Sequence, residues 1–446
     1  MRSDPTVCVI GAGAAGLAAA QRLREQGVDV AVLEARDRIG GRVWTLRPED
    51  LTVPIELGAE FLHGDTPELD RLTREAGLRT IDVAGRRWMS AGGRLRLEDD
   101  FWERLDRVMR RLDDERDPDR SFADAIAGMR SVAPADRRLA VQYVEGFHAA
   151  DTGRISERSL AEGGSPRGDV RERRIRRVIE GYDRVIASLA APVLGNVTLG
   201  TAVSRVRWRP RGVEVEHGVP GDNERRIIEA RAAIVTVPLG VLQAPHSDGG
   251  AGGIVFDPPL PDKQRAVTEL VMGTVARVVL QLDEPFWVGK WFARHAGDDR
   301  FDTMSFLMSQ ARVPFPIWWT PYPVRAPMLV GWRGGPAARG LSAMTRDETV
   351  AAATQSLAAV LDMTQRSVQK HVVAAFTHDW TNDPFARGAY SYVGVGGETA
   401  AARLARPVKG TLFFAGEHAD REGRNGTVHG AVASGWRAAD SVLREL

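Results

Sequence analysis

Residues 7–42 read VCVIGAGAAGLAAAQRLREQGVDVAVLEARDRIGGR, and this stretch decides the fold class. It begins with a β-branched, apolar run over 6–10, turns at Gly11–Gly16, continues as an apolar helical pattern over 14–26, and ends in a second apolar run over 28–33. Strand, glycine turn, helix and strand in quick succession form a βαβ unit. The sequence therefore predicts an α/β protein with a Rossmann-type domain at its start.

The turn in this unit has the spacing of a dinucleotide-binding loop. In a GxGxxG pattern, glycine permits a tight turn and a close approach of backbone amides to a pyrophosphate, whose charge the following helix N-terminus attracts. We expect five residues to form this loop: Gly11, Gly13, Ala14, Ala15 and Gly16. Glu34 ends the second strand, where a carboxylate accepts hydrogen bonds from ribose hydroxyls and repels a 2′-phosphate. NADP is therefore disfavoured.

A second glycine pair favours FAD over NAD. Arg36 is followed closely by Gly40, Gly41 and Arg42, directly after the βαβ unit. Two glycines beside an arginine allow a second backbone approach to the same pyrophosphate, and Arg42 can donate charge-assisted hydrogen bonds to a phosphate oxygen. We therefore predict that the cofactor is FAD.

Further motifs occur in order along nearly the whole chain. They are ERxxxGGR with Ala35 inserted after Glu34, ELGAEFLHG at 56–64, Met-Gly at 272–273 before EPFW at 284–287, DPFARGAYSY at 383–392, and FAGEH at 414–418 with TVHGA at 427–431. Together they resemble the flavin-dependent amine oxidases, which include monoamine and polyamine oxidases and histone lysine demethylases. The large helical insertion of the demethylases is absent, so demethylation is not implied.

The resemblance implies a Rossmann-type FAD-binding domain interleaved with an α+β substrate domain. We expect the FAD-binding domain at 1–85, 191–262 and 373–446, and the substrate domain at 86–190, mainly helical, and 263–372. The implied reaction oxidises an amine C–N bond: hydride passes from the α-carbon to flavin N5, and the imine hydrolyses. The expected partners are a small-molecule amine and oxygen or another electron acceptor.

The resemblance also implies which further residues contact the cofactor. Trp380 matches an aromatic residue beside the isoalloxazine, and Val203 matches a backbone contact to the adenine. The remaining positions are Ala35, Arg36, Gly58, Ala59, Glu60, Phe61, Gly416, Glu417, Thr427 and Val428. Ala389 stands where monoamine oxidases carry the cysteine that bonds to the flavin, so we expect non-covalent FAD.

Four residues are candidates for a role in substrate binding or catalysis. By resemblance, Tyr390 is one wall of an aromatic cage that faces the amine nitrogen, and Thr427 stands at the opposite wall. His63 matches a substrate-pocket position of the polyamine oxidases, although a structural role for a loop histidine is an equal alternative. The fourth candidate, Arg277, replaces a family residue.

Arg277 is the largest departure from the family. The family carries there a lysine whose ammonium holds a water against flavin N5, and none of the four lysines of this chain lies near that position in the sequence. A guanidinium keeps the positive charge but is planar, bulkier and never a base. We expect Arg277 either to slow reoxidation by oxygen or to pair with a substrate carboxylate.

Three alternatives to a simple amine oxidase remain open from the sequence. An L-amino acid oxidase would need an arginine for the substrate carboxylate. A flavin desaturase or porphyrinogen-type oxidase shares the Rossmann and GGR start but is not expected to carry both FLHG and GAYSY. A flavin-binding partner protein without turnover is the third.

Composition excludes several other classes. Lys+Arg at 60 against Asp+Glu at 59 leaves a net charge of +1, which gives no field to recruit nucleic acid or an anionic membrane. No apolar run is long enough to span a bilayer, no signal pattern is visible, and Cys8 is the single cysteine. We expect no metal, no disulfide and a cytoplasmic location.

Outside these motifs, periodicity predicts helices over 101–112, 347–361 and 430–443 and a strand over 411–415. The basic run RERRIRR at 171–177 has acidic neighbours, so we expect a solvated face or loop without function.

Overall fold

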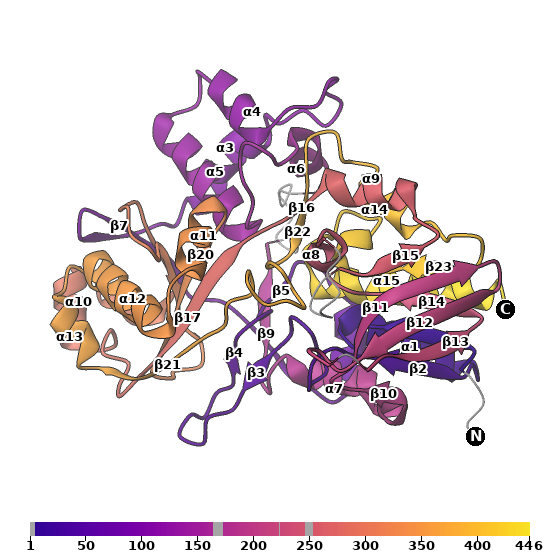
Figure 1. The fold of residues 1–446 in the computed structure, drawn as a ribbon. Coiled ribbons are helices and arrows are strands. Elements are labelled where there is room, and N and C mark those ends of the chain that lie inside the picture. The colour runs from indigo at the N-terminus through magenta and orange to yellow at the C-terminus, as the bar shows by residue number, and fades with distance from the viewer. Residues whose placement is uncertain (1–4, 164–172, 223, 246–252) are drawn as a thin grey trace.

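The computed structural model describes residues 5–163, 173–222, 224–245 and 253–446 and is drawn in Figure 1. The Rossmann sheet with its helices lies at the right of this view, a larger sheet lies at the left, and the helices α3–α6 lie at the top. No helix in the described ranges is long and apolar enough to cross a membrane.

The predicted βαβ unit is confirmed. Five parallel strands form the Rossmann sheet in the order β10-β2-β1-β14-β23. These strands, with the crossover helix, are β1 (Val7–Ile10), α1 (Ala14–Glu25), β2 (Val30–Leu33), β10 (Val197–Thr198), β14 (Ala232–Val235) and β23 (Leu412–Phe414). The central strands read as unbroken apolar runs because helices or other sheets cover both faces of a parallel sheet. Their carboxyl ends therefore open at one edge, where dinucleotides bind.

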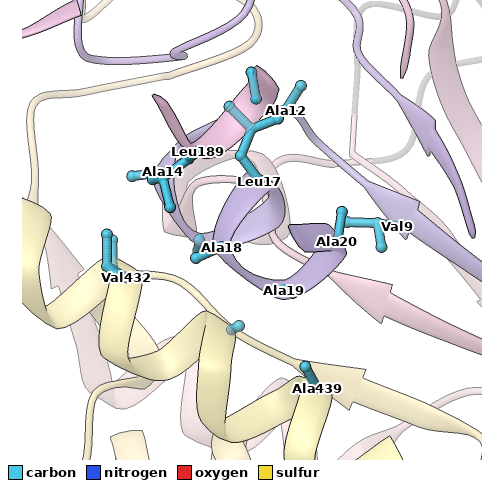
Figure 2. Close-up of a cluster of buried hydrophobic side chains, with 14 of the residues drawn as sticks. Val9, Ala12, Ala14, Leu17, Ala18, Ala19, Ala20, Leu189, Val432 and Ala439 are labelled. Atoms are coloured by element: carbon cyan, nitrogen blue, oxygen red, sulfur yellow. The ribbon is translucent and has the colours of Figure 1, made fainter. Parts of the chain in front are cut away.

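Small residues bring two helices close together on this sheet. Figure 2 shows Ala14 and Ala18 of α1 in one buried cluster with Val432 and Ala439 of α15 (Val428–Leu443). A Cβ on Gly435 would lie only 2.2 Å from the carbonyl oxygen of Ala15, so glycine is required there. The C-terminal helix α15 thereby holds the start of α1 in place, and with it the glycine turn that leads into α1.

A four-stranded sheet lies against the Rossmann sheet. Its order is β13-β12-β11-β15, formed by β11 (Ala202–Arg209), β12 (Gly212–Gly218), β13 (Arg226–Ala230) and β15 (Val255–Asp257). Val206, Val213 and Val215 pack with Cys8 and Leu33 of the Rossmann strands. The single cysteine is thus a buried core residue.

The larger sheet has seven strands in the order β21-β17-β20-β19-β18-β7-β8. They are β7 (Arg86–Ala91), β8 (Arg94–Leu97), β17 (Val275–Leu282), β18 (Met304–Ser309), β19 (Ile317–Trp319), β20 (Met328–Gly334) and β21 (Val372–Thr377). One face packs on α10 (Lys290–Ala296), α12 (Arg346–Leu361) and α13 (Gln365–Gln369). The helices α3 (Phe101–Met109), α4 (Phe122–Gly128), α5 (Pro134–Phe147) and α6 (Glu157–Gly163) form a separate cluster with Met89 and Met308.

Short elements connect these layers. The strands are β3 (Thr45–Leu46), β4 (Ile55–Glu56), β5 (Leu62–His63), β6 (Thr80–Asp82), β9 (Ile175–Val178), β16 (Leu270–Met272) and β22 (Ser391–Val393). The helices are α2 (Pro67–Glu75), α7 (Asp183–Ala190), α8 (Leu239–Leu242), α9 (Pro261–Glu269), α11 (Arg339–Ser342) and α14 (Ala400–Ala405).

The other expected elements are confirmed with small shifts at their ends. The helices expected over 101–112, 347–361 and 430–443 are α3, α12 and α15, and the strand expected over 411–415 is β23. Two details bear on the expected domain segments, whose boundaries stay predictions. Val185, Ile186 and Leu189 of α7 pack with α1, ahead of residue 191, and β21 joins the seven-stranded sheet, beyond residue 372.

Candidate active site

A cavity of about 750 Å³ lies between the carboxyl edge of the Rossmann strands and the seven-stranded sheet. Nearly all of the residues expected to touch the cofactor line it: Gly11, Gly13, Ala14, Ala15, Glu34, Ala35, Arg36, Gly40, Gly41, Arg42, Gly58, Ala59, Glu60, Phe61, Val203, Trp380, Gly416, Glu417, Thr427 and Val428. The four candidates for substrate contact, His63, Arg277, Tyr390 and Thr427, line it as well. Residues distant in sequence thus converge on one space.

Gly16 is the exception, and its role is to shape the loop. A Cβ on Gly16 would lie 1.9 Å from the carbonyl oxygen of Gly11, so only glycine lets the start of α1 pack under the turn. Gly11 itself has φ of +106°. Gly13, by contrast, has nothing within 4 Å of the place a Cβ would occupy, and it faces the cavity.

The two predicted glycine turns meet. The amide of Gly40 donates to the carbonyl of Ala12 at 2.9 Å, and Gly13 and Gly40 form a parallel bridge. A Cβ on Gly41 would lie 3.6 Å from the Cα of Gly13. The first amides of α1 have no partner within the helix, and the helix dipole adds positive charge there. This surface of backbone suits a pyrophosphate.

Glu34 lies at the edge of the same surface. Its Oε2 accepts from the amide of Ala12 at 2.7 Å and its Oε1 from the amide of Arg36 at 2.9 Å. Burial raises the pKa of Glu34, and the two amide bonds oppose that rise. Each oxygen keeps a lone pair for a further donor, as a ribose hydroxyl would be. The glycine surface and Glu34 therefore fit the adenosine and pyrophosphate part of FAD.

The charged side chains at this end are already paired. Arg36 makes two hydrogen bonds of 2.8 Å to Asp383. Arg42 donates through Nη1 to the carbonyl of Ala389 at 2.7 Å and to Glu417 at 2.9 Å. Burial works against the ionised form of Glu417, yet the charge of Arg42 and hydrogen bonds outweigh it and lower the pKa of Glu417 to about 2. Phosphate recognition by Arg42 stays a prediction that must use its other N–H groups.

A buried cluster of three charges lies deeper in the cavity wall, and we call it the Glu60 cluster. Arg277 donates through Nη2 to Glu60 at 2.6 Å and through Nη1 to the carbonyl of Gly58 at 3.0 Å. Arg177 donates through Nε to the other oxygen of Glu60 at 2.7 Å, and the indole of Trp319 donates to Glu60 as well. Two guanidiniums share one carboxylate, so the cluster keeps a net positive charge.

Arg277 is therefore fixed rather than free. It is only 4% exposed, and its Nε has no hydrogen-bond partner among the described residues. Because Nη1 and Nη2 of Arg277 already donate to Gly58 and Glu60, a two-point pairing of Arg277 with a substrate carboxylate is disfavoured. None of the four lysines, all within the described ranges, lines the cavity.

Sequence reasoning missed Arg177. The run at 171–177 was expected to be solvated, but Arg176 and Arg177 are buried, at 6% and 9% exposure, while 171 and 172 lie outside the described residues. The expectation was wrong for Arg176 and Arg177, because β9 pairs with β5 and β6. Arg174 of the same run is exposed, as expected. The apolar residues Ile175 and Val178, which bound the two arginines, were the available signal of a buried strand.

The hydroxyl groups of the substrate candidates Tyr390 and Thr427 already make hydrogen bonds within the protein. The hydroxyl of Tyr390 donates to the carbonyl of Phe147 at 2.7 Å, which holds its ring at the cavity wall. Thr427 caps α15 by accepting from the amide of Gly430, and it donates to the carbonyl of Arg424. Its hydroxyl is therefore already used, and a substrate role for Thr427 stays a prediction.

His63 is uncharged near neutral pH. Burial is the main cause that lowers its pKa to about 4, with His429 adding to the effect and Glu60 opposing it. Its ring packs edge-on against Phe147 at 5.0 Å and tilted against Phe61 at 5.6 Å. It belongs to an aromatic wall and offers no charge to a substrate.

No group of three or more His, Cys, Asp or Glu in the described ranges is placed to hold a metal ion. The groups that do line the cavity are the backbone of the glycine turns, the charged residues Glu60 and Arg277, and aromatic rings.

Comparisons with known proteins agree with this geometry. The family model for flavin containing amine oxidoreductase matches residues 14–443. Polyamine oxidase 2 of Arabidopsis thaliana is 29% identical over 473 residues, which cover 98% of this chain and 88% of that protein. Lysine-specific histone demethylase 1 homolog 3 of the same plant is 29% identical and aligns with 99% of this chain but 30% of its own length. The structure of cyclohexylamine oxidase from Brevibacterium oxydans has a TM-score of 0.80 at 23% identity and 99% coverage of both chains.

The family match covers most of the chain, and the two-domain amine oxidase fold expected from the motifs is confirmed. An enzyme is thereby favoured over a flavin-binding partner without turnover, and amine oxidation over carbon–carbon desaturation. The chain belongs to the flavin containing amine oxidoreductases and carries out flavin-dependent oxidation of an amine.

Proposed function

We propose that the chain oxidises a small-molecule amine with FAD held without a covalent bond, and that oxygen is the electron acceptor. When bound, FAD would accept a hydride from the carbon next to the amine nitrogen. The observation that carries the proposal is that one cavity joins the glycine loop, Glu34 and Trp380 to the ring of Tyr390.

The residues of the chain favour a neutral amine in this cavity. The Glu60 cluster places a net positive charge in the wall, and a like charge disfavours an ammonium. His63 is uncharged, so it neither repels the amine nor removes its proton at neutral pH. Tyr390 presents a ring to the amine and holds its own hydroxyl against Phe147. The amine therefore loses its proton to solvent before it reacts.

Non-covalent binding of FAD is supported by two residues. Ala389 lines the cavity at the family position of the flavin-bonded cysteine and has no group that can form the bond. Cys8 is fully buried in β1, and burial raises the pKa of its thiol to about 12, which makes it inert. Acid precipitation of the yellow protein should leave the colour in the supernatant. Colour retained in the pellet would contradict this part of the proposal.

The role of oxygen is tested at Arg277. If the lysine of relatives promotes reaction of the reduced flavin with oxygen, then Arg277→Lys should speed reoxidation and leave reduction by the amine unchanged. The two half-reactions are measured separately by stopped flow. If neither half-reaction changes, oxygen reactivity does not depend on this position, and a different acceptor becomes the better proposal.

The amine reaction itself is tested by anaerobic mixing with a panel of amines. At least one should bleach the flavin absorbance, and the aldehyde or ketone released by hydrolysis should equal the flavin reduced. Bleaching by none of them, in protein that still holds FAD, would contradict the proposal. A cytoplasmic location stays a prediction from the sequence.

A further inference from the structure

The arginines that line the cavity differ in whether they form an ion pair. Six arginines line it within the described residues, and five of them pair with a carboxylate: Arg36, Arg42, Arg173, Arg277 and Arg424. The sixth, Arg87, has no ion pair with any described residue. Removing a guanidinium from water without a counter-ion costs free energy. An anionic ligand that paired with Arg87 would offset that cost.

The position of Arg87 follows from its strand. Side chains alternate along β7, so Trp88 enters the core beneath the seven-stranded sheet while Arg87 and Met89 point to the opposite side. Its neighbour Arg86 is exposed and pairs with Asp99 at 3.1 Å. The strand thus places one arginine in water and the next in the cavity wall.

Aromatic rings surround the guanidinium of Arg87. Its central carbon lies 5.2 Å from the ring of Trp102, and 5.7 Å from the rings of Phe101 and Phe306. Burial lowers the pKa of Arg87, but an arginine stays charged in proteins. Aromatic faces hold a cation in place without neutralising it, which leaves the N–H groups of Arg87 for an anion.

A row of contacts through aromatic residues leads from Tyr390 to Arg87, and we call the Arg87 end of this row the far end of the cavity. Phe147, whose carbonyl receives the Tyr390 hydroxyl, stacks on Tyr143 at 5.1 Å. The ring of Tyr143 lies 6.2 Å from that of Trp102, which in turn contacts Arg87. A ligand held by both ends would extend past the rings of Phe147, Tyr143 and Trp102, and these rings favour an apolar spacer.

Three of the four acidic residues that line the cavity in the described part of the chain are buried and already accept hydrogen bonds. Four acidic side chains line the cavity in the described part of the chain: Glu34, Glu60, Glu162 and Glu417. Glu34, Glu60 and Glu417 are buried in the contacts given above, and Glu162 is exposed near the end of α6. Apart from exposed Glu162, Arg87 is thus the charged side chain of the described lining for which neither a hydrogen bond nor an ion pair is found.

We propose that Arg87 binds the carboxylate of the substrate, and that the substrate is an amino carboxylate whose amine and carboxylate are separated by an apolar spacer. This inference rests on the proposed amine oxidation and names the substrate class of that site. An α-amino acid fits less well, because its carboxylate would lie beside the amine, where Arg277 is already paired with Glu60. A diamine fits less well, because it would bring a second cation towards Arg87.

Four compounds of equal carbon number test the proposal on FAD-loaded protein: 6-aminohexanoate, hexylamine, hexane-1,6-diamine and norleucine. In the unaltered protein, kcat/KM should be highest for 6-aminohexanoate. Arg87→Gln should lower kcat/KM for 6-aminohexanoate by about tenfold or more, the scale of lost hydrogen bonds to a charged group, and leave hexylamine unchanged. Arg87→Lys should recover part of the loss, and Arg86→Gln is the matched surface control.

A binding measurement separates failure of this inference from failure of the proposed function. Hexanoate lacks the amine, so its binding is followed by the change in flavin absorbance whether or not any amine is oxidised. Arg87→Gln should weaken hexanoate binding by about tenfold or more, and Arg86→Gln should not. Unaltered hexanoate binding in Arg87→Gln, equal losses for hexylamine and 6-aminohexanoate, or a preference for the diamine or norleucine would overturn the inference.

Discussion

The two ends of the cavity recognise their ligands by different means. At the cofactor end, glycines expose backbone amides, and the charged side chains Glu34, Arg36 and Arg42 are satisfied within the protein. At the far end, aromatic side chains form the wall, and Arg87 keeps an unpaired charge. The charged groups of the cofactor end thus have partners before the cofactor binds, whereas Arg87 at the far end gains a partner only when a ligand binds. Glu60 and Arg277 of the Glu60 cluster line the same cavity.

The largest effect is expected at the Glu60 cluster. Glu60→Gln removes the carboxylate that two buried guanidiniums share, and it should lower the free energy of unfolding by about 3–5 kcal/mol because buried charge is left uncompensated. Chemical denaturation of the FAD-loaded protein measures this. Glu75→Gln, in an exposed ion pair with Arg71, is the control. A loss no greater than that of the control would mean that the cluster does not anchor the middle of the cavity.

The next effect is expected at the cofactor end. Glu34→Ala should weaken FAD binding by about 1–3 kcal/mol, the scale of hydrogen bonds whose partners are left unpaired. Titration of the protein stripped of its flavin with FAD gives the affinity, and exposed Asp37→Ala is the neighbouring control. Unchanged affinity would remove Glu34 from the ribose site, and with it the contrast between a polar cofactor end and an aromatic far end.

His418, which follows Glu417 at the cofactor end, should make the free energy of unfolding depend on pH, with a smaller effect than the two substitutions above. Burial lowers the pKa of His418 to about 4, and its ring nitrogens have no hydrogen-bond partner among the described residues. The unfolded chain takes up this proton near pH 6.5, so the contribution to stability is present above pH 6.5 and is lost as pH falls towards 4. The slope should be about 1.4 kcal/mol per pH unit for each such histidine.

The measurement is the free energy of unfolding between pH 4 and 7. Removal of His418 as His418→Gln should reduce the acid slope by one proton relative to the unaltered protein. An identical slope in both proteins would show that His418 is solvated or paired in the folded protein.

The sequence predicted the cofactor end far better than the far end. The GxGxxG loop and the GGR turn depend on backbone geometry that few residues other than glycine allow, so Gly11, Gly16 and Gly41 are visible as a local pattern. The far end is built by tertiary contacts. Arg87 and Trp102 belong to different elements, and nothing local distinguishes Arg87 from the exposed Arg86 beside it.

The same limit explains the error at 171–177. Whether an arginine is solvated or buried depends on where a carboxylate lies in the fold, and the partner of Arg177 is Glu60, more than a hundred residues earlier. The position of Arg277 was predicted in the correct strand and at the cavity, but its pairing with Glu60 was not. Pairing of charges across a fold leaves no periodic pattern in the sequence.

We expect the amine to be oxidised in its neutral form within a cavity whose wall carries positive charge. The most direct test is the rate of anaerobic flavin reduction by 6-aminohexanoate and by hexylamine from pH 6 to 10. Both rates should rise with pH along the titration of the amine, because only the neutral amine has the lone pair that assists hydride release and because the Glu60 cluster repels the ammonium. A rate that stays flat over this range for every amine that reduces the flavin would contradict it.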